Sequence, residues 1–239
     1  MHSNKVLWAL VIINLVVTSL LAVSLYRGDS ARHYIKSNAG DVLTSVNDFI
    51  AAEQNKGLEE AEGKIADNED FLYGDGRHAF LGNRNADFAI VEFLDYNCGY
   101  CKRAHTAVTE LIAKNDDIKV IIVEFPILSP TSTEAAAWAL AADEQGKFQE
   151  FHDALMVNKA PINTDSLKDV AKSVGLDVDK AEEFANNPKT LMRLEENKAR
   201  AMQMGFQGTP GFIIGDEVLR GFAEYPAMQN ILDAQRGKK

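Results

Sequence analysis

Two cysteines, Cys98 and Cys101, restrict the possible folds of this chain more than any other feature of its sequence. They are the only cysteines among 239 residues, and two residues separate them. The apolar run 88–94 comes shortly before them, and apolar residues at helical spacing follow from 99 to 112. A second run, 118–125, is rich in β-branched residues. This order predicts a βαβ unit with parallel strands and with the cysteine pair at the start of its helix.

A cysteine pair at the start of a helix is suited to redox chemistry. Unpaired N–H groups and the positive end of the helix dipole stabilise a thiolate on Cys98 and lower its pKa. A lower pKa gives more reactive thiolate and a better leaving group. Cys101, one turn into the helix, is shielded and close enough to attack a mixed disulfide on Cys98. We therefore expect a redox-active disulfide, with Cys98 as the nucleophile and Cys101 as the resolving thiol.

Two other uses of the cysteine pair are open. One is an inert structural disulfide. The other is a zinc site, which needs two further ligands, and the chain has no second cysteine pair. His105 lies one turn after Cys101, but His78 and His152 are remote and match no ligand spacing. We expect neither a metal nor another cofactor.

Glu92 is a carboxylate in the otherwise apolar run 88–94. Burying it is costly unless the side chain is paired or protonated. Desolvation would raise its pKa and allow it to exchange protons with the Cys101 thiol. The alternative is that Glu92 lies at a sheet edge or beside a cationic partner.

The dipeptide Thr209-Pro210 comes just before the short apolar run 211–214. A proline that enters a core strand removes a donor of the ladder, which suggests an unusual, possibly cis, peptide bond. Such a turn beside the cysteines would leave the Thr209 backbone groups available to an extended substrate. Pro210 and Thr209 are therefore candidate substrate-binding residues.

The remaining segments predict helices and one hairpin. A helical block covers about 131–205. Two short apolar runs then flank the turn 215–217, which indicates a hairpin, and a closing helix is expected at about 225–235. Residues 74–85 are rich in glycine and asparagine and are expected to form a loop.

The N-terminal part has a different character. Residues 6–25 are almost all apolar and could either span a membrane or serve as a cleaved signal peptide, so 1–26 is assigned to one of these. Both outcomes export the rest of the chain, into a compartment where disulfides persist. Residues 27–75 predict an acidic pair of helices, the first ending near Gly57. Their apolar surface is too small for a core, so they pack on the main domain, 76–239, or on a second copy of the chain.

Composition narrows the functional classes. The formal net charge is −10, which offers no basic surface for nucleic acid. Two cysteines cannot build a disulfide framework, so packing must supply the stability.

Taken together, these motifs resemble those of the thioredoxin fold and, through the helical insertion, its DsbA-type branch of thiol–disulfide oxidoreductases. The resemblance covers about residues 80–239 and implies an α/β fold of βαβ…ββα order. It implies that Glu92 is the buried proton-relay carboxylate and that Thr209 and Pro210 form the cis-proline loop. Two departures stand out: Gly99-Tyr100 replaces the Pro-His of the best-known oxidase, and Thr209 is the residue usual in disulfide isomerases.

The resemblance implies an enzyme of the periplasm or cell envelope that forms or isomerises disulfides. Its partners would be cysteine-containing envelope proteins and a membrane redox partner. Relatives with a helical extension, the Com1-like and ScsC-like groups, tend to be homo-oligomers, so a dimer or trimer is expected. The alternatives are a client-binding chaperone and a protein that holds a soft cation such as Cu(I) on the same dithiol.

Overall fold

The structure is a computed structural model that describes residues 15, 18–19, 22–23, 25–30, 32–33, 35–74 and 76–237, with backbone alone at 49–62. The chain divides into two units, Met1–Leu58 and Glu59–Lys239. The expected signal peptide or anchor, 1–26, lies outside the described residues except at a few isolated positions. Among the residues described, no helix is long and apolar enough to cross a membrane.

A single sheet organises the second unit. Its strands are β1 (Ala79–Gly82), β2 (Phe88–Leu94), β3 (Ile118–Glu124), β4 (Gly211–Ile214) and β5 (Glu217–Arg220). They form a five-stranded sheet in the order β1-β3-β2-β4-β5. β2 and β3 are parallel, and the other neighbouring pairs are antiparallel. Helix α3 (Gly99–Lys114) joins β2 to β3, so the βαβ unit and the later hairpin are both confirmed.

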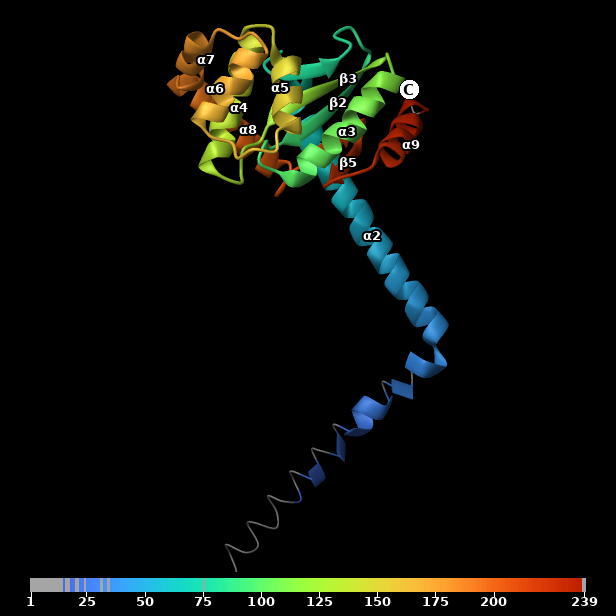
Figure 1. The fold of residues 1–239 in the computed structure, drawn as a ribbon. Helices are drawn as coiled ribbons and strands as arrows, with labels where there is room; N and C mark the ends of the chain where they lie inside the picture. Colours follow the sequence, from blue (N-terminus) through green and yellow to red (C-terminus); the bar gives the residue numbers. More distant parts are fainter. Residues whose placement is uncertain are drawn as a thin grey trace, which may run out of the picture. The chain divides into compact units, whose positions relative to one another are not determined.

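The helical insertion stands between β3 and β4. It consists of α4 (Pro130–Glu144), α5 (Phe148–Val157), α6 (Thr164–Ser173), α7 (Val178–Ala185) and α8 (Pro188–Gln203). The closing helix α9 (Tyr225–Arg236) packs beside α3. Figure 1 shows α4 to α7 gathered at one side of the sheet, while α3 and α9 lie across one of its faces. The thioredoxin-type α/β fold with an inserted helical subdomain is therefore as expected.

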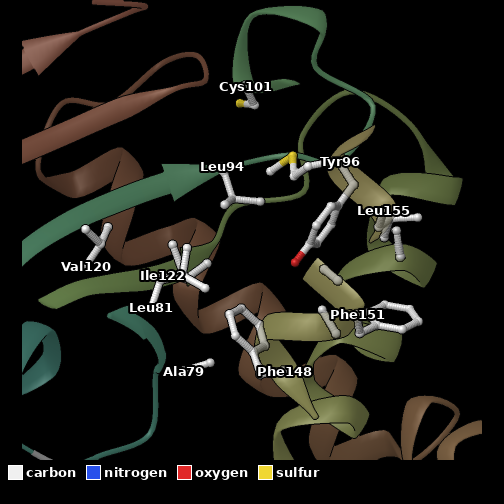
Figure 2. Close-up of a cluster of buried hydrophobic side chains, with 14 of the residues drawn as sticks. Ala79, Leu81, Leu94, Tyr96, Cys101, Val120, Ile122, Phe148, Phe151 and Leu155 are labelled. Carbon is white, nitrogen blue, oxygen red and sulfur yellow. The ribbon is translucent and has the colours of Figure 1, made fainter. Parts of the chain in front are cut away.

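The sheet separates two buried cores, because successive side chains of a strand point to opposite faces. Ile90 and Leu94 of β2 lie with Cys101 of α3 in the larger core. Val91 and Phe93 lie in the smaller core on the opposite face. Figure 2 shows part of the larger core, where side chains of β2 and β3 meet those of α5. Glu92 alternates with Val91 and Phe93 and so belongs to the face that carries α3.

The predicted loop at 74–85 contains a strand. Residues Ala79–Gly82 form β1, which pairs with β3 at the edge of the sheet. Its four residues are too few to show a period, and Gly82 at its end resembles a loop signal. The sequence-based expectation of a loop was wrong here for that reason.

The N-terminal extension also differs from expectation. α2 (Ala39–Ala66) is one continuous helix, and not two helices with an end near Gly57. A glycine inside a helix costs only about 1 kcal/mol relative to alanine, and glutamate, lysine, leucine and alanine around it favour the helix. After α2, the π-helical turn η1 (Asp70–Gly74) buries Phe71 and Leu72 in the smaller core.

Candidate active site

Cys98 lies at the first turn of α3, as its N-cap residue. Its side chain is 7% exposed, whereas that of Cys101, one turn later, is 0% exposed. Both are free thiols in the structure. The Cys98 thiol donates a hydrogen bond to the Thr209 carbonyl over 3.2 Å. Both cysteines are thus buried, and Cys98 keeps a small exposed area that Cys101 lacks.

The two thiols differ strongly in acidity. A hydrogen bond from the Cys101 thiol makes the largest contribution to lowering the pKa of Cys98 to about 5. Hydrogen bonds from Thr209 and from the backbone of Cys101 and Tyr100 act in the same direction, while burial opposes them. Burial, the hydrogen bond to Cys98 and the negative charge of Glu92 raise the pKa of Cys101. Cys98 is therefore the thiolate at neutral pH, and Cys101 keeps its proton.

Glu92 is buried at the centre of the sheet. β2 pairs with β3 on one side and with β4 on the other, so Glu92 does not lie at a sheet edge. Its side chain is 2% exposed, and Oε1 has no hydrogen-bond partner. Burial raises the pKa of Glu92 to about 8, and no cation contributes to this value. The alternative of an edge position or a cationic partner was therefore wrong.

The Thr209–Pro210 peptide bond is cis, as the position of the proline suggested. This dipeptide precedes β4 and brings the Thr209 carbonyl to the Cys98 thiol. A cavity of about 430 Å³ lies alongside, lined by Gly205, Phe206, Gln207, Gly208, Thr209, Pro210, Arg220 and Gly221. The fold brings the cysteines and the proline loop together.

Asp95, which directly follows β2, connects two loops of the site. Its Oδ1 accepts from the Asn97 N–H over 2.8 Å. Its Oδ2 accepts from the N–H groups of Ile127 and Leu128, each over 2.9 Å. The loop before the cysteines is thereby fixed to the loop that follows β3.

The sequence analysis missed a buried polar chain behind the site. The Tyr96 hydroxyl lies 3.1 Å from Glu124 Oε1 and 3.0 Å from His152 Nδ1. Figure 2 shows Tyr96 directed into the buried cluster beside Phe148, Phe151 and Leu155. Burial raises the pKa of Glu124 well above its ordinary value. The sequence pattern that singled out Glu92, a carboxylate in an apolar strand, also applies to Glu124 and could have identified it.

His152 is not remote from His105, contrary to the sequence analysis. Their ring centroids lie 5.2 Å apart. The packing of α3 against α5 brings them together, a long-range contact that spacing along the chain does not reveal. With Asp153 they form a group of potential metal ligands.

A thioredoxin-type sheet, a helix that starts at a reactive thiol, a buried second thiol and an adjacent cis-proline define the class of thiol–disulfide oxidoreductases. Within that class, residues 89–233 match the model of the DSBA-like thioredoxin domain. The chain belongs to this family.

Solved structures agree with this assignment. A thioredoxin-like oxidoreductase from Silicibacter pomeroyi DSS-3 is 36% identical, with a TM-score of 0.68 over 71% of this chain and 98% of that one. The catalytic domain of Proteus mirabilis ScsC is 28% identical, with a TM-score of 0.67 over 74% and 98%. The thiol-disulfide exchange protein alpha-DsbA2 from Wolbachia pipientis is 28% identical, with a TM-score of 0.69 over 75% and 97%.

The curated relatives are longer proteins. The Na(+)/H(+) antiporter NhaA 1 of Salinispora arenicola is 31% identical over 135 residues, which is 56% of this chain and 21% of the antiporter. The chain thus spans about a fifth of the length of that relative. The likeness is confined to that part and gives no support for ion transport.

Proposed function

We propose that this chain is an exported enzyme that forms or isomerises disulfides in cysteine-containing envelope proteins. Cys98 acts as the nucleophile and Cys101 as the resolving thiol. Glu92 transfers protons to and from Cys101, and Thr209 with Pro210 binds the substrate. The observation that carries the proposal is the contrast between an acidic Cys98, which is 7% exposed, and a weakly acidic Cys101, which is fully buried.

As an oxidase, the enzyme starts with the Cys98–Cys101 disulfide. A substrate thiolate attacks the sulfur of Cys98, a mixed disulfide forms, and Cys101 leaves with the electron pair. Because Cys101 is buried, its thiolate takes a proton at once, and protonated Glu92 is the donor at hand. A second substrate thiolate then attacks the substrate sulfur and releases Cys98 as a stable thiolate, which leaves both enzyme thiols reduced.

As an isomerase, the enzyme starts reduced. The Cys98 thiolate attacks a wrong disulfide of the substrate, which forms a mixed disulfide and releases one substrate thiolate. That thiolate attacks another substrate disulfide, and the thiolate released there attacks the substrate sulfur of the mixed disulfide and expels Cys98 as a thiolate. If the substrate stalls, Cys101 gives its proton to ionised Glu92 and attacks Cys98, which frees the substrate in reduced form. Thr209 before the proline favours isomerisation or a dual activity.

The test compares the wild type with the single variants C98S and C101S. Scrambled ribonuclease A should regain activity with the wild type and not with C98S. C101S should accumulate as a mixed disulfide with its substrate, because the resolving thiol is absent. Measuring the reduction potential in parallel decides between oxidation and isomerisation. Equal refolding by wild type and C98S would favour a chaperone, and stoichiometric copper on the purified reduced protein would favour metal handling.

We also propose that the extension, 27–75, forms the contacts of a homodimer or homotrimer. Leu43 and Val46 of α2 support this, since these apolar side chains are 62% and 47% exposed. Oligomerisation would enclose a space for clients and shield the dithiol from a membrane redox partner.

The truncation that tests this must spare the second unit. Removing residues up to 58 leaves Phe71 and Leu72 in their core. Light scattering should show a larger species for the mature wild type and a monomer for the truncated chain. A monomeric wild type would contradict the proposal.

A further inference from the structure

Three potential metal ligands lie together where α3 packs against α5. His105, His152 and Asp153 each offer one ligand atom, and these atoms all lie within 4.8 Å of one another. β3 and α4 separate the two helices along the chain. The fold therefore brings these three residues together, and a cation bound by them would connect α3 to α5.

His105 lacks the hydrogen bonds that a buried imidazole normally makes. Its side chain is 11% exposed, and Nε2 lies 3.5 Å from Asp153 Oδ1, which is long for a hydrogen bond. Its Nδ1 is buried and has no hydrogen-bond partner. Two ligand atoms of a tetrahedral zinc site with bonds of about 2.1 Å lie about 3.4 Å apart. The contact between His105 and Asp153 therefore has the length of a ligand pair.

His152 is oriented by a second layer of polar groups. The Tyr96 hydroxyl contacts its Nδ1 over 3.0 Å and Glu124 Oε1 over 3.1 Å. Such an outer partner is typical of histidines that bind metals, because it fixes the ring and its tautomer. Within the described part of the chain, Nε2 of His152 makes no hydrogen bond and remains available as a ligand.

The chemistry of the three side chains suits one class of cation. Asp153 adds a negative charge, and its 47% exposed side chain gives a route from solvent. Two nitrogens and one oxygen favour zinc-type cations over magnesium or calcium, which prefer oxygen alone.

We propose that His105, His152 and Asp153 bind a zinc-type divalent cation that ties the redox helix α3 to helix α5 of the insertion. Water would complete the coordination, as in three-ligand zinc sites. The site is separate from the Cys98–Cys101 dithiol and does not depend on the proposed enzymatic function.

The test uses the full mature chain without an affinity tag and with both cysteines replaced, C98S/C101S, so that the dithiol cannot bind metal. Titration with Co²⁺ should give one ion per chain with the visible absorption of a tetrahedral site, and Zn²⁺ should displace it. Added H105N or D153N should each weaken binding by about tenfold or more. Y96F, which removes the outer partner of His152, should weaken it by about 10- to 100-fold.

The matched control is H33N, which removes an exposed histidine of the N-terminal unit and should leave the affinity unchanged. Zn²⁺ should raise the melting temperature of C98S/C101S and of its H33N derivative, but not that of the H105N derivative. If H105N fails to fold by circular dichroism, D153N decides, because it changes a half-exposed side chain. If C98S/C101S binds no ion, the proposal is overturned. If D153N binds the ion equally well, the ion is adventitious only, and the proposal is overturned as well.

Discussion

Thr209 offers a direct test of how the acidity of Cys98 arises. The hydrogen bond from Cys101 contributes most to the low pKa of Cys98, and Thr209 is the next favourable contributor. The Thr209 hydroxyl is buried and has no hydrogen-bond partner in the structure, so it is available to a thiolate on Cys98. Thr209→Val keeps the β-branched shape and removes only this donor. The substitution should therefore destabilise the thiolate without changing the neighbouring backbone.

The size of the effect follows from the strength of such a bond. A hydrogen bond to a charged group contributes about 1.5–3 kcal/mol, and about 1.4 kcal/mol corresponds to one pKa unit. Sulfur is a weak acceptor, so the lower end applies. T209V should raise the pKa of Cys98 from about 5 to about 6. Since a stable thiolate favours the reduced form, the same change should lower the reduction potential by about 30 mV at neutral pH.

The assay is the ultraviolet absorbance of the thiolate during a pH titration, supported by alkylation rates with iodoacetamide. The control is T109V, which makes the same replacement at an exposed position of α3. An unchanged pKa in T209V would show that the Thr209 hydroxyl does not reach the thiolate. A rise in T109V as large as in T209V would show that the effect is not local.

Three further predictions concern the same region. Cys101→Ala should raise the pKa of Cys98 by more than T209V does, since Cys101 is the larger contributor, and the same titration measures it. Glu92 is protonated in the folded chain up to about pH 8 but ionises above about pH 4.5 when unfolded, so folding weakens as pH rises between these values. Glu92→Gln should therefore raise the free energy of unfolding of the reduced protein, by an amount that grows by up to about 1.4 kcal/mol per pH unit in that window. Urea unfolding at several pH values measures this difference, and a difference that does not change with pH would refute the prediction. Gly211→Ala should lower the free energy of unfolding by about 1–3 kcal/mol, because its Cβ would lie 2.5 Å from Phe206, whereas Gly208→Ala, with open space, should cost much less.

The central part of the fold and the site could be predicted because their signals are local. The runs that form β2 and β3 are long and apolar, and the cysteines occur at the junction where a helix must begin. The cis peptide bond before Pro210 could be anticipated because a proline entering a strand has few ways to fit. The buried state of Glu92 followed from its position in a run that must lie at the centre of a sheet.

The parts that were wrong depend on distant contacts. β1 exists because β3 offers it a free edge, and its own four residues carry almost no strand pattern. α2 continues through Gly57 because its neighbours favour helix strongly enough to tolerate one glycine. The approach of His105 to His152 depends on how α5 docks on α3, which no spacing in the sequence encodes.

The two faces of the sheet explain why this site can hold so many buried polar groups. The face toward α3 carries Glu92 and Glu124, with Tyr96 beyond the end of β2, next to the buried thiol of Cys101. Apart from Lys119 near the start of β3, the opposite face of β2 and β3 is apolar, and Val91, Phe93, Ile121 and Val123 form one cluster with Phe125. Burying polar groups destabilises the first face, and the apolar side chains of both cores offset that cost. This division lets the redox face keep protonated carboxyls beside a thiol that must gain and lose its proton away from water.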